Sequence, residues 1–245
     1  MSPAHYNRGM SVNMPAREFE RRRAKVAPLA AMLGDRHGHP VWRAGVDPVD
    51  ELVSCILSQS TNDTNRDRAF NALKARWPDW AGVVQAPTEE VIATIRVAGL
   101  GNQKGPRIQA LLRDIHEQQG AFNIDFLGQL PLEEARAWLT SLHGVGPKTA
   151  AIVLCFAFGR PSLPVDTHVH RVGRRLGLIP EKMSAERAHP LMEALVPPDQ
   201  HYSFHIQLIL HGREICHARR PDCANCPVSG CCDWYGARQA TGSPG

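Results

Sequence analysis

Four cysteines close to the end of the chain restrict its fold more than any other feature of the sequence. They are Cys216, Cys223, Cys226 and Cys232, with the spacing C-x6-C-x2-C-x5-C. Four thiolates so close together form an all-sulfur ligand set, which binds zinc or an iron–sulfur cluster in preference to hard cations. Zinc modules usually pair two separated C-x2-C units, whereas here one such unit lies between longer arms. The spacing therefore predicts a metal site and favours a cluster, with zinc as the alternative.

Two disulfides would be another use of these cysteines, but they require an oxidising compartment. Residues 1–24 are polar and rich in arginine, without the apolar segment of a secretion signal or a run that could span a bilayer. We therefore expect a cytoplasmic protein, associated with the nucleoid if it is bacterial, whose thiols bind metal. Cys231 adjoins the fourth ligand and could compete with it. Cys55 and Cys155 lie in apolar runs and are expected to be buried thiols.

The composition is that of a globular protein with an arginine-rich surface. The chain has 245 residues, of which 43% are hydrophobic, enough for one large core or two smaller ones. The formal net charge of +4 does not by itself indicate a nucleic-acid ligand. The 28 basic residues, however, comprise five lysines and 23 arginines, and guanidinium groups bind phosphate in a forked geometry. This bias is compatible with a polyanionic partner, although a GC-rich genome would produce it too.

Apolar residues recur with helical spacing along almost the whole chain and strand patterns are nearly absent, so we predict an all-α protein. One helix starts at Asp47 and Pro48, a capping residue followed by proline at the first helical position. Further helices are expected at about 17–33, 63–76, 88–97, 104–119, 131–141, 148–158, 167–176, 185–196 and 200–215. Residues 1–16 and 236–245 are expected to be flexible tails.

Residues 142–150, with the sequence LHGVGPKTA, predict a tight hairpin between two helices. Gly144 and Gly146 allow the backbone to turn sharply and to present its N–H groups, and Pro147 opens the next helix. The start of a helix is an anion site, which suits a nucleic-acid phosphate, although an ordinary helix–helix turn would look similar. Lys148 lies in the first helical turn, where the helix dipole favours its neutral, nucleophilic form.

Asp166 precedes an expected helix, in the segment PVDTHVHR of residues 164–171. An aspartate at this position is most often an N-cap. Only one helix and a turn separate it from Lys148, so its carboxylate can return beside the amine and accept the proton of a nucleophile. His168 and His170 are two positions apart on a helix and point to nearly opposite sides, so we do not expect them to share a metal ion.

Together these residues resemble endonuclease III, of the helix-hairpin-helix DNA glycosylases, over residues 17–233. Residues 56–61, ILSQST, resemble the segment whose glutamine, here Gln59, enters the gap in DNA. Residues 99–102, GLGN, resemble the loop whose leucine, here Leu100, wedges the duplex. Residues 142–150 match the hairpin with the catalytic lysine, and residues 165–168, VDTH, match the segment of the catalytic aspartate. The cysteine spacing is that family's pattern for binding a 4Fe-4S cluster.

The resemblance implies a two-domain all-α fold with DNA in the cleft between the domains. A six-helix barrel domain would span residues 41–160, while residues 17–40 and 161–235 would form the iron–sulfur cluster domain. Lys148 and Asp166 would be the catalytic residues and face each other at the cleft. The residues implied in DNA binding are Gln59, Leu100, Gly144, Val145, Gly146, Thr149, His168, Arg219 and Arg220. The cluster would have a structural role, because it would hold the loop of residues 217–220 rigid, with redox sensing as the alternative.

The activity implied is that of a base excision repair glycosylase with AP lyase activity. It would act as a monomer on double-stranded DNA that contains a damaged base or an abasic site. Lys148 would attack C1′ as the base leaves, and the resulting Schiff base would permit β-elimination of the 3′ phosphate. Oxidised pyrimidines are the expected lesions. The alternatives are a mismatched thymine as substrate, a glycosylase without lyase activity, and a non-catalytic DNA-binding protein.

Two hairpin residues depart from the family pattern. His143 stands where proline is common, and Pro147 stands where arginine or lysine is frequent. Neither change removes a catalytic group, but His143 could alter the approach of the hairpin to phosphate.

Overall fold

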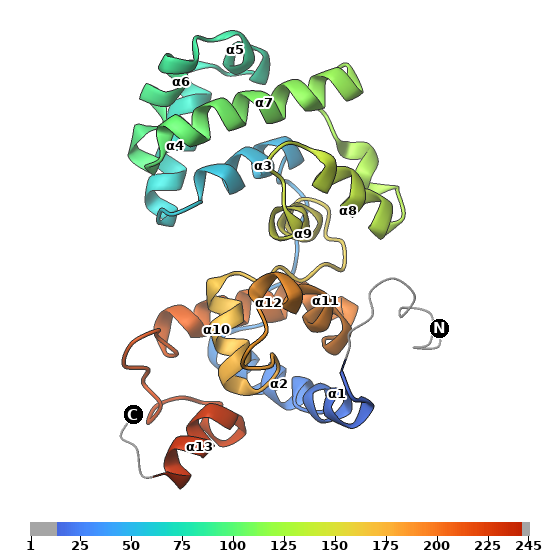
Figure 1. Ribbon diagram of the computed structural model, residues 1–245, viewed down its shortest axis with the longest axis vertical. Coiled ribbons are helices and arrows are strands. Elements are labelled where there is room, and N and C mark those ends of the chain that lie inside the picture. The colour runs from blue at the N-terminus through green and yellow to red at the C-terminus, as the bar shows by residue number, and fades with distance from the viewer. Residues whose placement is uncertain (1–13, 242–245) are drawn as a thin grey trace. The chain divides into compact units, whose positions relative to one another are not determined.

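The computed structural model describes residues 14–241, and all secondary structure in that range is helical (Figure 1). The predicted all-α class is confirmed. The chain divides into two compact units. We call residues 44–160 the central unit, and the residues up to Arg43 together with those from Pro161 onward the terminal unit. Within residues 14–241, no helix has both the length and the apolar character needed to cross a membrane.

The central unit is a helical array around one core. It consists of α3 (Pro48–Leu57), α4 (Asp63–Arg76), α5 (Trp80–Gln85), α6 (Thr88–Thr94), α7 (Gly101–Gln119), α8 (Leu132–Ser141) and α9 (Pro147–Phe156), with the short 3-10 turns η2 (Arg96–Ala98) and η3 (Asp125–Gly128). The connection from α8 to α9 is the segment that the sequence predicts to be a hairpin.

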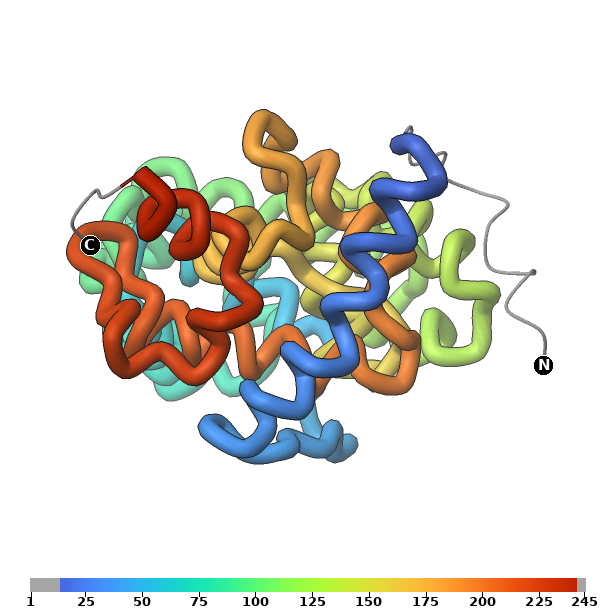
Figure 2. The backbone as a smooth tube through the Cα atoms, turned by 90° about the horizontal axis from the view of Figure 1, so that it is seen from below, coloured from blue at the N-terminus to red at the C-terminus, as the bar shows by residue number. Residues whose placement is uncertain are grey.

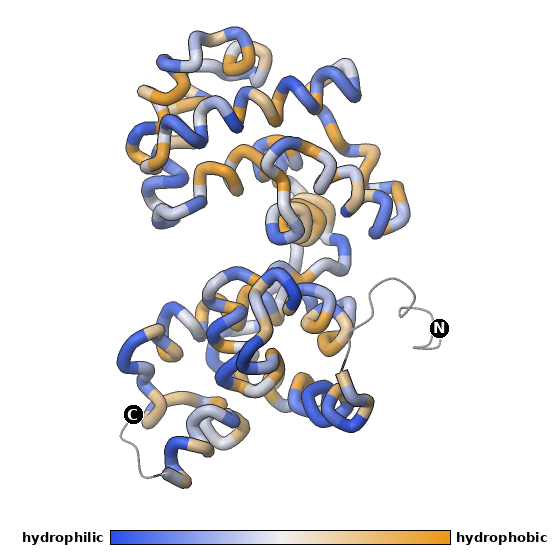
Figure 3. Tube along the Cα trace, viewed as in Figure 1, coloured by the Kyte–Doolittle hydropathy of each residue, from blue (hydrophilic) through white to orange (hydrophobic). Residues whose placement is uncertain are grey.

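Helix α3 lies in the core of the central unit, packed against α4, α7 and α9. Asp47 starts it as predicted, because its Oδ1 accepts hydrogen bonds of 2.9 Å from the N–H groups of Val49 and Asp50. The apolar residues that follow in α3 are orange in Figure 3, and Leu52 and Leu57 are 0% exposed. Because each such burial contributes about 1.5–3 kcal/mol, the core fixes α3 and the site residues directly after it.

Lys104 ties α7 to the ends of two other elements of the central unit. Its side chain is 2% exposed, and its Nζ donates hydrogen bonds to the C=O groups of Leu57, at 2.8 Å, and Ala98, at 2.7 Å. Leu57 and Ala98 are the last residues of α3 and η2. The carbonyl groups at the end of a helix have no hydrogen-bond partner within that helix. Burial lowers the pKa of the Lys104 ammonium. This one side chain therefore holds the segments that lead to Gln59 and to Leu100.

The terminal unit combines helices from both ends of the chain. It contains α1 (Ala16–Arg23), α2 (Val26–His37), α10 (Thr167–Leu176), α11 (Ala185–Leu195), α12 (His201–Glu214) and α13 (Asp233–Ala240), with the 3-10 turns η4 (Pro198–Gln200) and η5 (Ser229–Cys231). Helix α12 packs against α2 and α10. Their contact surface is apolar and buried, with Leu29, Val172 and Phe204 each 0% exposed. Figure 2 shows this unit from below, with α1 and α2 in blue and α13 in red.

Two helices, α1 and α2, replace the single helix expected at 17–33. Ala24 and Lys25 separate them, and the N–H group of Lys25 donates to the C=O group of Arg22 at 3.1 Å. Pro28 has no N–H group, so an unbroken helix would leave the carbonyl of Ala24 without its usual donor. The proline therefore marks the break that the apolar spacing alone does not show.

Two short helices were not expected. Helix α5 has six residues, too few to show a period, and it is started by Asp79, whose Oδ1 accepts a 2.7 Å hydrogen bond from the N–H group of Gly82. Residues 236–240, expected to belong to a flexible tail, continue helix α13 instead. In α13, Trp234 lies against the guanidinium groups of Arg175 and Arg238, each 4.7 Å from its ring. Ala16, also expected to belong to a tail, is the first residue of α1. Residues 1–13 and 242–245 of the expected tails lie outside the described residues.

Candidate functional site

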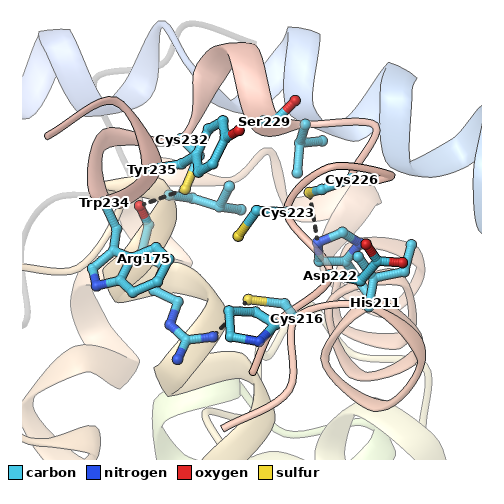
Figure 4. A pocket seen from close by; sticks show the side chains of 14 residues that line it. Arg175, His211, Cys216, Asp222, Cys223, Cys226, Ser229, Cys232, Trp234 and Tyr235 are labelled. Carbon is cyan, nitrogen blue, oxygen red and sulfur yellow. Dashed lines mark hydrogen bonds between the residues drawn. The ribbon is translucent and has the colours of Figure 1, made fainter. Parts of the chain in front are cut away.

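The four cysteines of the C-x6-C-x2-C-x5-C pattern line one cavity in the terminal unit. The cavity is also lined by Arg175 of α10 and His211 of α12. Figure 4 shows the sulfur atoms of Cys216, Cys223, Cys226 and Cys232 facing this common space. Cys231 is not among the residues that line it. The structure therefore brings together the four cysteines that the spacing selects and leaves out their neighbour.

The backbone around this cavity contains little regular structure. Between the end of α12 and the start of α13 it forms only the three-residue turn η5, and its hydrogen bonds are local, such as 3.4 Å from the N–H group of Cys226 to the C=O group of Cys223. Val228, 0% exposed, is the main apolar anchor of the segment. A group bound by all four cysteines would therefore add cross-links to a segment whose backbone–backbone hydrogen bonds are only local.

The protein alone does not favour thiolates in this cavity. Burial raises the pKa of the Cys226 thiol to about 11, and burial is also the main reason why the pKa values of Cys223 and Cys232 are raised. One cation touches the sulfurs, because Arg175 donates a 3.2 Å hydrogen bond to Cys216 Sγ. A bound metal group would supply the additional positive charge that thiolate ligands need.

The four thiols fit a soft metal group that is larger than a single ion. In residues 14–241, no three His, Cys, Asp or Glu side chains converge closely enough to hold a single metal ion. The four thiols instead surround the cavity, and all are free of disulfides. Sulfur donors around a common space are compatible with a cluster of several metal atoms.

The loop between the first two cysteines carries Arg219 and Arg220, which are both exposed. Two arginines of α10 hold the base of this loop. Arg175 donates hydrogen bonds to the C=O groups of residues 217 and 218 at 2.7 and 3.1 Å, and Arg171 donates to that of Cys216 at 3.0 Å. The structure thus fixes the loop backbone while its two cationic side chains face solvent.

Three non-glycine residues in the described chain have positive φ angles: Ser60 at 54°, Leu100 at 51° and Arg220 at 49°. Leu100 and Arg220 are residues that the sequence assigns to DNA binding, and Ser60 directly follows Gln59. A side chain in this region costs about 1–2 kcal/mol, so such residues persist where other constraints require them. Leu100 is in addition 48% exposed, although its side chain is large and apolar.

The hairpin between α8 and α9 has the features predicted for it. Gly144 has a φ angle of 80°, Gly146 caps α9, and Pro147 is the first residue of that helix. The N–H group of Val145 donates to the C=O group of Leu142 at 3.1 Å, which closes the turn. Lys148 follows with an exposed side chain.

Two residues of α7 that the sequence analysis missed hold this hairpin in place. Asp114 Oδ2 accepts a 3.0 Å hydrogen bond from the N–H group of His143, and Arg107 donates one to the C=O group of Gly144. Arg107 also donates a 3.1 Å hydrogen bond to Oε1 of Gln59. The hairpin and Gln59 are therefore joined by one guanidinium. The seven-residue separation of Arg107 and Asp114 places them on one face of α7, but nothing in their local sequence indicates this role.

Buried ionisable groups lie near Lys148 in the central unit. Burial is the main cause that raises the pKa of the Cys55 thiol; the charge of Glu51 raises it further, and the charge of Lys148 lowers it. Cys55 is 5% exposed, as expected, and its Sγ lies 3.9 Å from Glu51 Oε1. Burial also raises the pKa of Glu51, while the charge of Arg66 lowers it. Cys155, 1% exposed, is the other buried thiol that was predicted.

Asp166 is the N-cap of α10, because its Oδ1 accepts a 2.7 Å hydrogen bond from the N–H group of Val169. It belongs to the terminal unit, whereas Lys148 belongs to the central unit. His168 Nδ1 lies 3.1 Å from a guanidinium nitrogen of Arg171, and burial lowers the pKa of His168. His170 contacts the C=O group of residue 183 through Nε2 at 2.8 Å. The two histidines have separate partners, as their helical spacing predicts.

Comparison with known proteins places most of the chain in one group. Residues 53–198 match the family model of the HhH-GPD superfamily base excision DNA repair protein. Endonuclease III of Escherichia coli (strain K12) is 32% identical over 213 residues, which make up 86% of this chain and 96% of that protein. A putative DNA glycosylase of Arabidopsis thaliana is 32% identical over 178 residues, or 73% of this chain. The match spans only 58% of the length of the plant protein.

Two solved structures share the fold. A non-covalent endonuclease III–DNA complex aligns with a TM-score of 0.74 and 26% identity, over 89% of this chain and 98% of that chain. A thermostable thymine-DNA glycosylase aligns with a TM-score of 0.72 and 25% identity, over the same shares of the two chains. The fold predicted from the ordered motifs is therefore present.

Proposed function

This chain belongs to the HhH-GPD superfamily of base excision DNA repair proteins, and within it we propose that the protein is a bifunctional DNA glycosylase. It would remove an oxidised pyrimidine from double-stranded DNA and then cleave the strand 3′ of the abasic site by β-elimination. The observation that carries this proposal is the position of Lys148. It is an exposed amine in the first turn of α9, directly after a hairpin with the glycines of the family motif.

Lys148 is the proposed nucleophile. Its amine attacks C1′ of the damaged nucleotide, the C1′–N bond to the base breaks, and the base leaves with the electron pair. Opening of the sugar ring gives an imine between Nζ and C1′. The imine makes the C2′ proton acidic, so its removal expels the 3′ phosphate and breaks the strand. Lys104 is a poor alternative nucleophile, because it is buried and donates to two carbonyl groups.

Asp166 is the proposed proton acceptor and electrostatic partner in this reaction. Its carboxylate would stabilise the positive charge that develops on the sugar and accept the proton of the attacking amine. It already has a structural role, since Oδ1 caps α10. Half burial and the bond to Val169 N–H hold the carboxylate in one orientation.

DNA binding is proposed to use elements of both units. In the central unit the hairpin amides and Thr149 would contact phosphate, while Gln59 and Leu100 would fill the space that the flipped nucleotide leaves. In the terminal unit His168 and the exposed Arg219 and Arg220 would contact the backbone of the duplex. The exposed, strained Leu100 supports the wedge, and the bond between Arg107 and Gln59 supports a fixed position for the glutamine.

The four cysteines are proposed to hold a 4Fe-4S cluster, with zinc as the alternative. The cavity between them and the sulfur-only donor set support this assignment. When bound, the cluster would act as a cross-link that holds the loop with Arg219 and Arg220 in position for phosphate. Because its ligands must be reduced thiols, we also propose that the protein works inside the cell. We further propose that it acts as a monomer.

Borohydride trapping tests the central claim. If Lys148 is the nucleophile, borohydride added during turnover reduces the imine and leaves a covalent protein–DNA adduct. The variant Lys148→Gln should lose both the adduct and strand cleavage but still bind the duplex, since the hairpin amides remain. Lys182→Gln is the matched control, because Lys182 is also an exposed lysine. Trapping that persists in Lys148→Gln would assign the chemistry to another amine.

Substitutions of Asp166 separate its two roles. Asp166→Asn keeps the cap of α10 but removes the charge, so base release should slow by roughly 10²-fold or more with little change in stability. Asp166→Ala should show the same loss of rate and in addition destabilise the protein by about 1 kcal/mol, because the cap is lost. Equal rates in wild type and Asp166→Asn would contradict the catalytic assignment.

A monofunctional glycosylase for mismatched thymine is the second candidate. It is favoured by the likeness to the thermostable thymine-DNA glycosylase. In that case activated water would attack C1′ and Lys148 would have a structural role. Release of thymine from a G·T duplex without any trapped adduct in the wild-type protein would establish it in place of the bifunctional enzyme. A protein that binds these duplexes but releases no base would instead be the non-catalytic DNA-binding relative.

A further inference from the structure

Two buried histidines form a line that ends at one of the cysteines. His211 of α12 is 1% exposed, and its Nε2 lies 3.6 Å from Cys226 Sγ. Its other ring nitrogen, Nδ1, lies 3.4 Å from Nε2 of His37, the last residue of α2, whose side chain is also 1% exposed. Figure 4 shows the ring of His211, which also lines the cavity, directed at Cys226. Neither histidine has a place in the proposed base excision reaction.

The line continues to the surface through charged residues. His37 Nδ1 lies 3.6 Å from Glu214 Oε2, whose side chain is 44% exposed, and Arg36 lies 3.5 Å from the same oxygen. The contact between the two rings needs one donor nitrogen and one acceptor nitrogen, and a neutral imidazole has one of each.

The identity of the group at Cys226 decides which nitrogen carries the proton. A metal-bound cysteine is a thiolate, which can only accept a hydrogen bond. The nitrogen that faces it, Nε2 of His211, must then carry the proton, so that Nδ1 of the same ring is the acceptor. The partner of Nδ1 is Nε2 of His37, which must donate. The two neutral rings thus form one directed chain of donors that ends at the sulfur.

We propose that His37 and His211 are positioning residues for the metal group, in which His37 orients an N–H group of His211 toward the Cys226 thiolate and so raises the reduction potential of the cluster. This inference rests on the proposed 4Fe-4S cluster. A hydrogen bond to a ligand sulfur withdraws negative charge from the metal–sulfur bonds and stabilises the reduced, more negative state. Arg175 makes the equivalent contact with Cys216, so donors approach the cavity from two different helices.

The competing explanation for the two histidines is that they only pack α2 against α12. Their ring centroids lie 5.6 Å apart, edge to face, between these helices. Variants of each histidine separate the two roles. His211→Leu and His37→Leu remove the donor nitrogens but retain apolar bulk. His211→Gln and His37→Gln place an amide N–H near the position of Nε2. His205→Gln is the control, because His205 is a buried histidine of α12 that bonds a backbone carbonyl and does not line the cavity.

The measurements are iron and sulfide per chain, the reduction potential in a redox titration, and the iron–sulfur stretching frequencies. His211→Leu should shift the potential to lower values and the stretching frequencies to higher values, because the sulfur loses its donor. His37→Leu should give shifts of the same sign but smaller size. Both glutamine variants should remain close to wild type. Exposure to air should remove the cluster from His211→Leu about tenfold faster than from wild type.

A fully loaded His211→Leu variant with the wild-type potential would overturn the inference. A wild-type potential in His37→Leu would exclude the role of His37. Loss of the cluster from both leucine variants and also from His205→Gln would show that the histidines act through helix packing and not through the sulfur. A wild-type protein with zinc or without iron would overturn the cluster proposal and this inference with it. Base release, assayed on the same preparations, reports separately on the proposed catalytic function.

Discussion

At the scale of the residue, Leu100 shows how a stability cost points to a function. It combines a φ angle of 51° with a large apolar side chain that is 48% exposed. Each feature is unfavourable in a protein that only has to fold. Lys104 holds the preceding segment through the carbonyl of Ala98, so the strained conformation is imposed by the surroundings and not by the loop itself.

Replacing Leu100 by glycine should therefore separate stability from function. Leu100→Gly relieves the left-handed conformation, so the free energy of unfolding should rise by about 1 kcal/mol. Base excision should become slower, because no side chain fills the space of the flipped nucleotide, while affinity for undamaged duplex should change little. Urea denaturation and single-turnover excision measure the two effects. A variant that is both more stable and equally active would contradict the wedge assignment.

Glu51 provides a prediction about pH. Burial raises its folded-state pKa above the ordinary 4.5, so the native protein binds this proton more tightly than the unfolded chain does. Its contribution to stability is then lost as pH rises from about 4.5 through the folded-state pKa. Glu51→Gln should stabilise the protein relative to wild type at pH 8, and the difference should vanish near pH 4. Urea midpoints at both pH values test this, with the exposed Glu89→Gln as control. An equal difference at both pH values would show that the titration of Glu51 is not the cause.

At the scale of the element, the loop between Cys216 and Cys223 illustrates how a segment without a helix is held. Arg171 and Arg175 of α10 bind its backbone carbonyls, so the arginines of the loop remain available to solvent. The hairpin between α8 and α9 is held in the same manner by Arg107 of α7. In both cases a helix provides side chains that fix a loop proposed to bind DNA.

The salt dependence of DNA binding tests the role of the first loop. Affinity that comes from phosphate contacts should fall linearly with the logarithm of salt concentration. The double variant with Arg219→Ala and Arg220→Ala should reduce that slope by roughly one to two units without changing the preference for a lesion. Arg187→Ala is a control at an exposed arginine of α11. An unchanged slope in the double variant would exclude these side chains from phosphate binding.

At the scale of the whole molecule, the chain builds two cores, and the terminal unit draws on both ends of the sequence. The proposed catalytic pair is divided between them, with Lys148 in the central unit and Asp166 in the terminal unit. Each unit also contributes DNA-binding candidates. The proposed activity is therefore a property of the complete chain and not of either unit.

The metal content of the purified protein provides a prediction at this scale. The purified protein should be brown and contain about four irons per chain. Cys223→Ser or Cys226→Ser should lose the metal together with the ordered structure of residues 216–232, measured by hydrogen exchange, while the core of the central unit should retain its protection. Cys231→Ser should resemble wild type, because Cys231 does not line the cavity. Colourless protein with stoichiometric zinc would overturn the cluster assignment and leave the fold intact.

Local patterns in the sequence determined the all-α class, the hairpin with Gly144, the cap at Asp47 and the set of four cysteines, and the comparisons confirmed the family. These features depend on hydrogen bonds and backbone angles within a few residues, so spacing reveals them. Their residue-level chemistry, above all that of Lys148 and Asp166, stays a prediction.

The tertiary structure alone decided which distant side chains meet. Arg107 joins Gln59 to Gly144, Lys104 joins the ends of α3 and η2, and His37 reaches His211 across 174 positions of the sequence. No local pattern marks such residues, because their partners are set by the packing of whole helices around a core and not by the chain near them. For the same reason the cysteines could be identified from their spacing, whereas the histidines beside them could not.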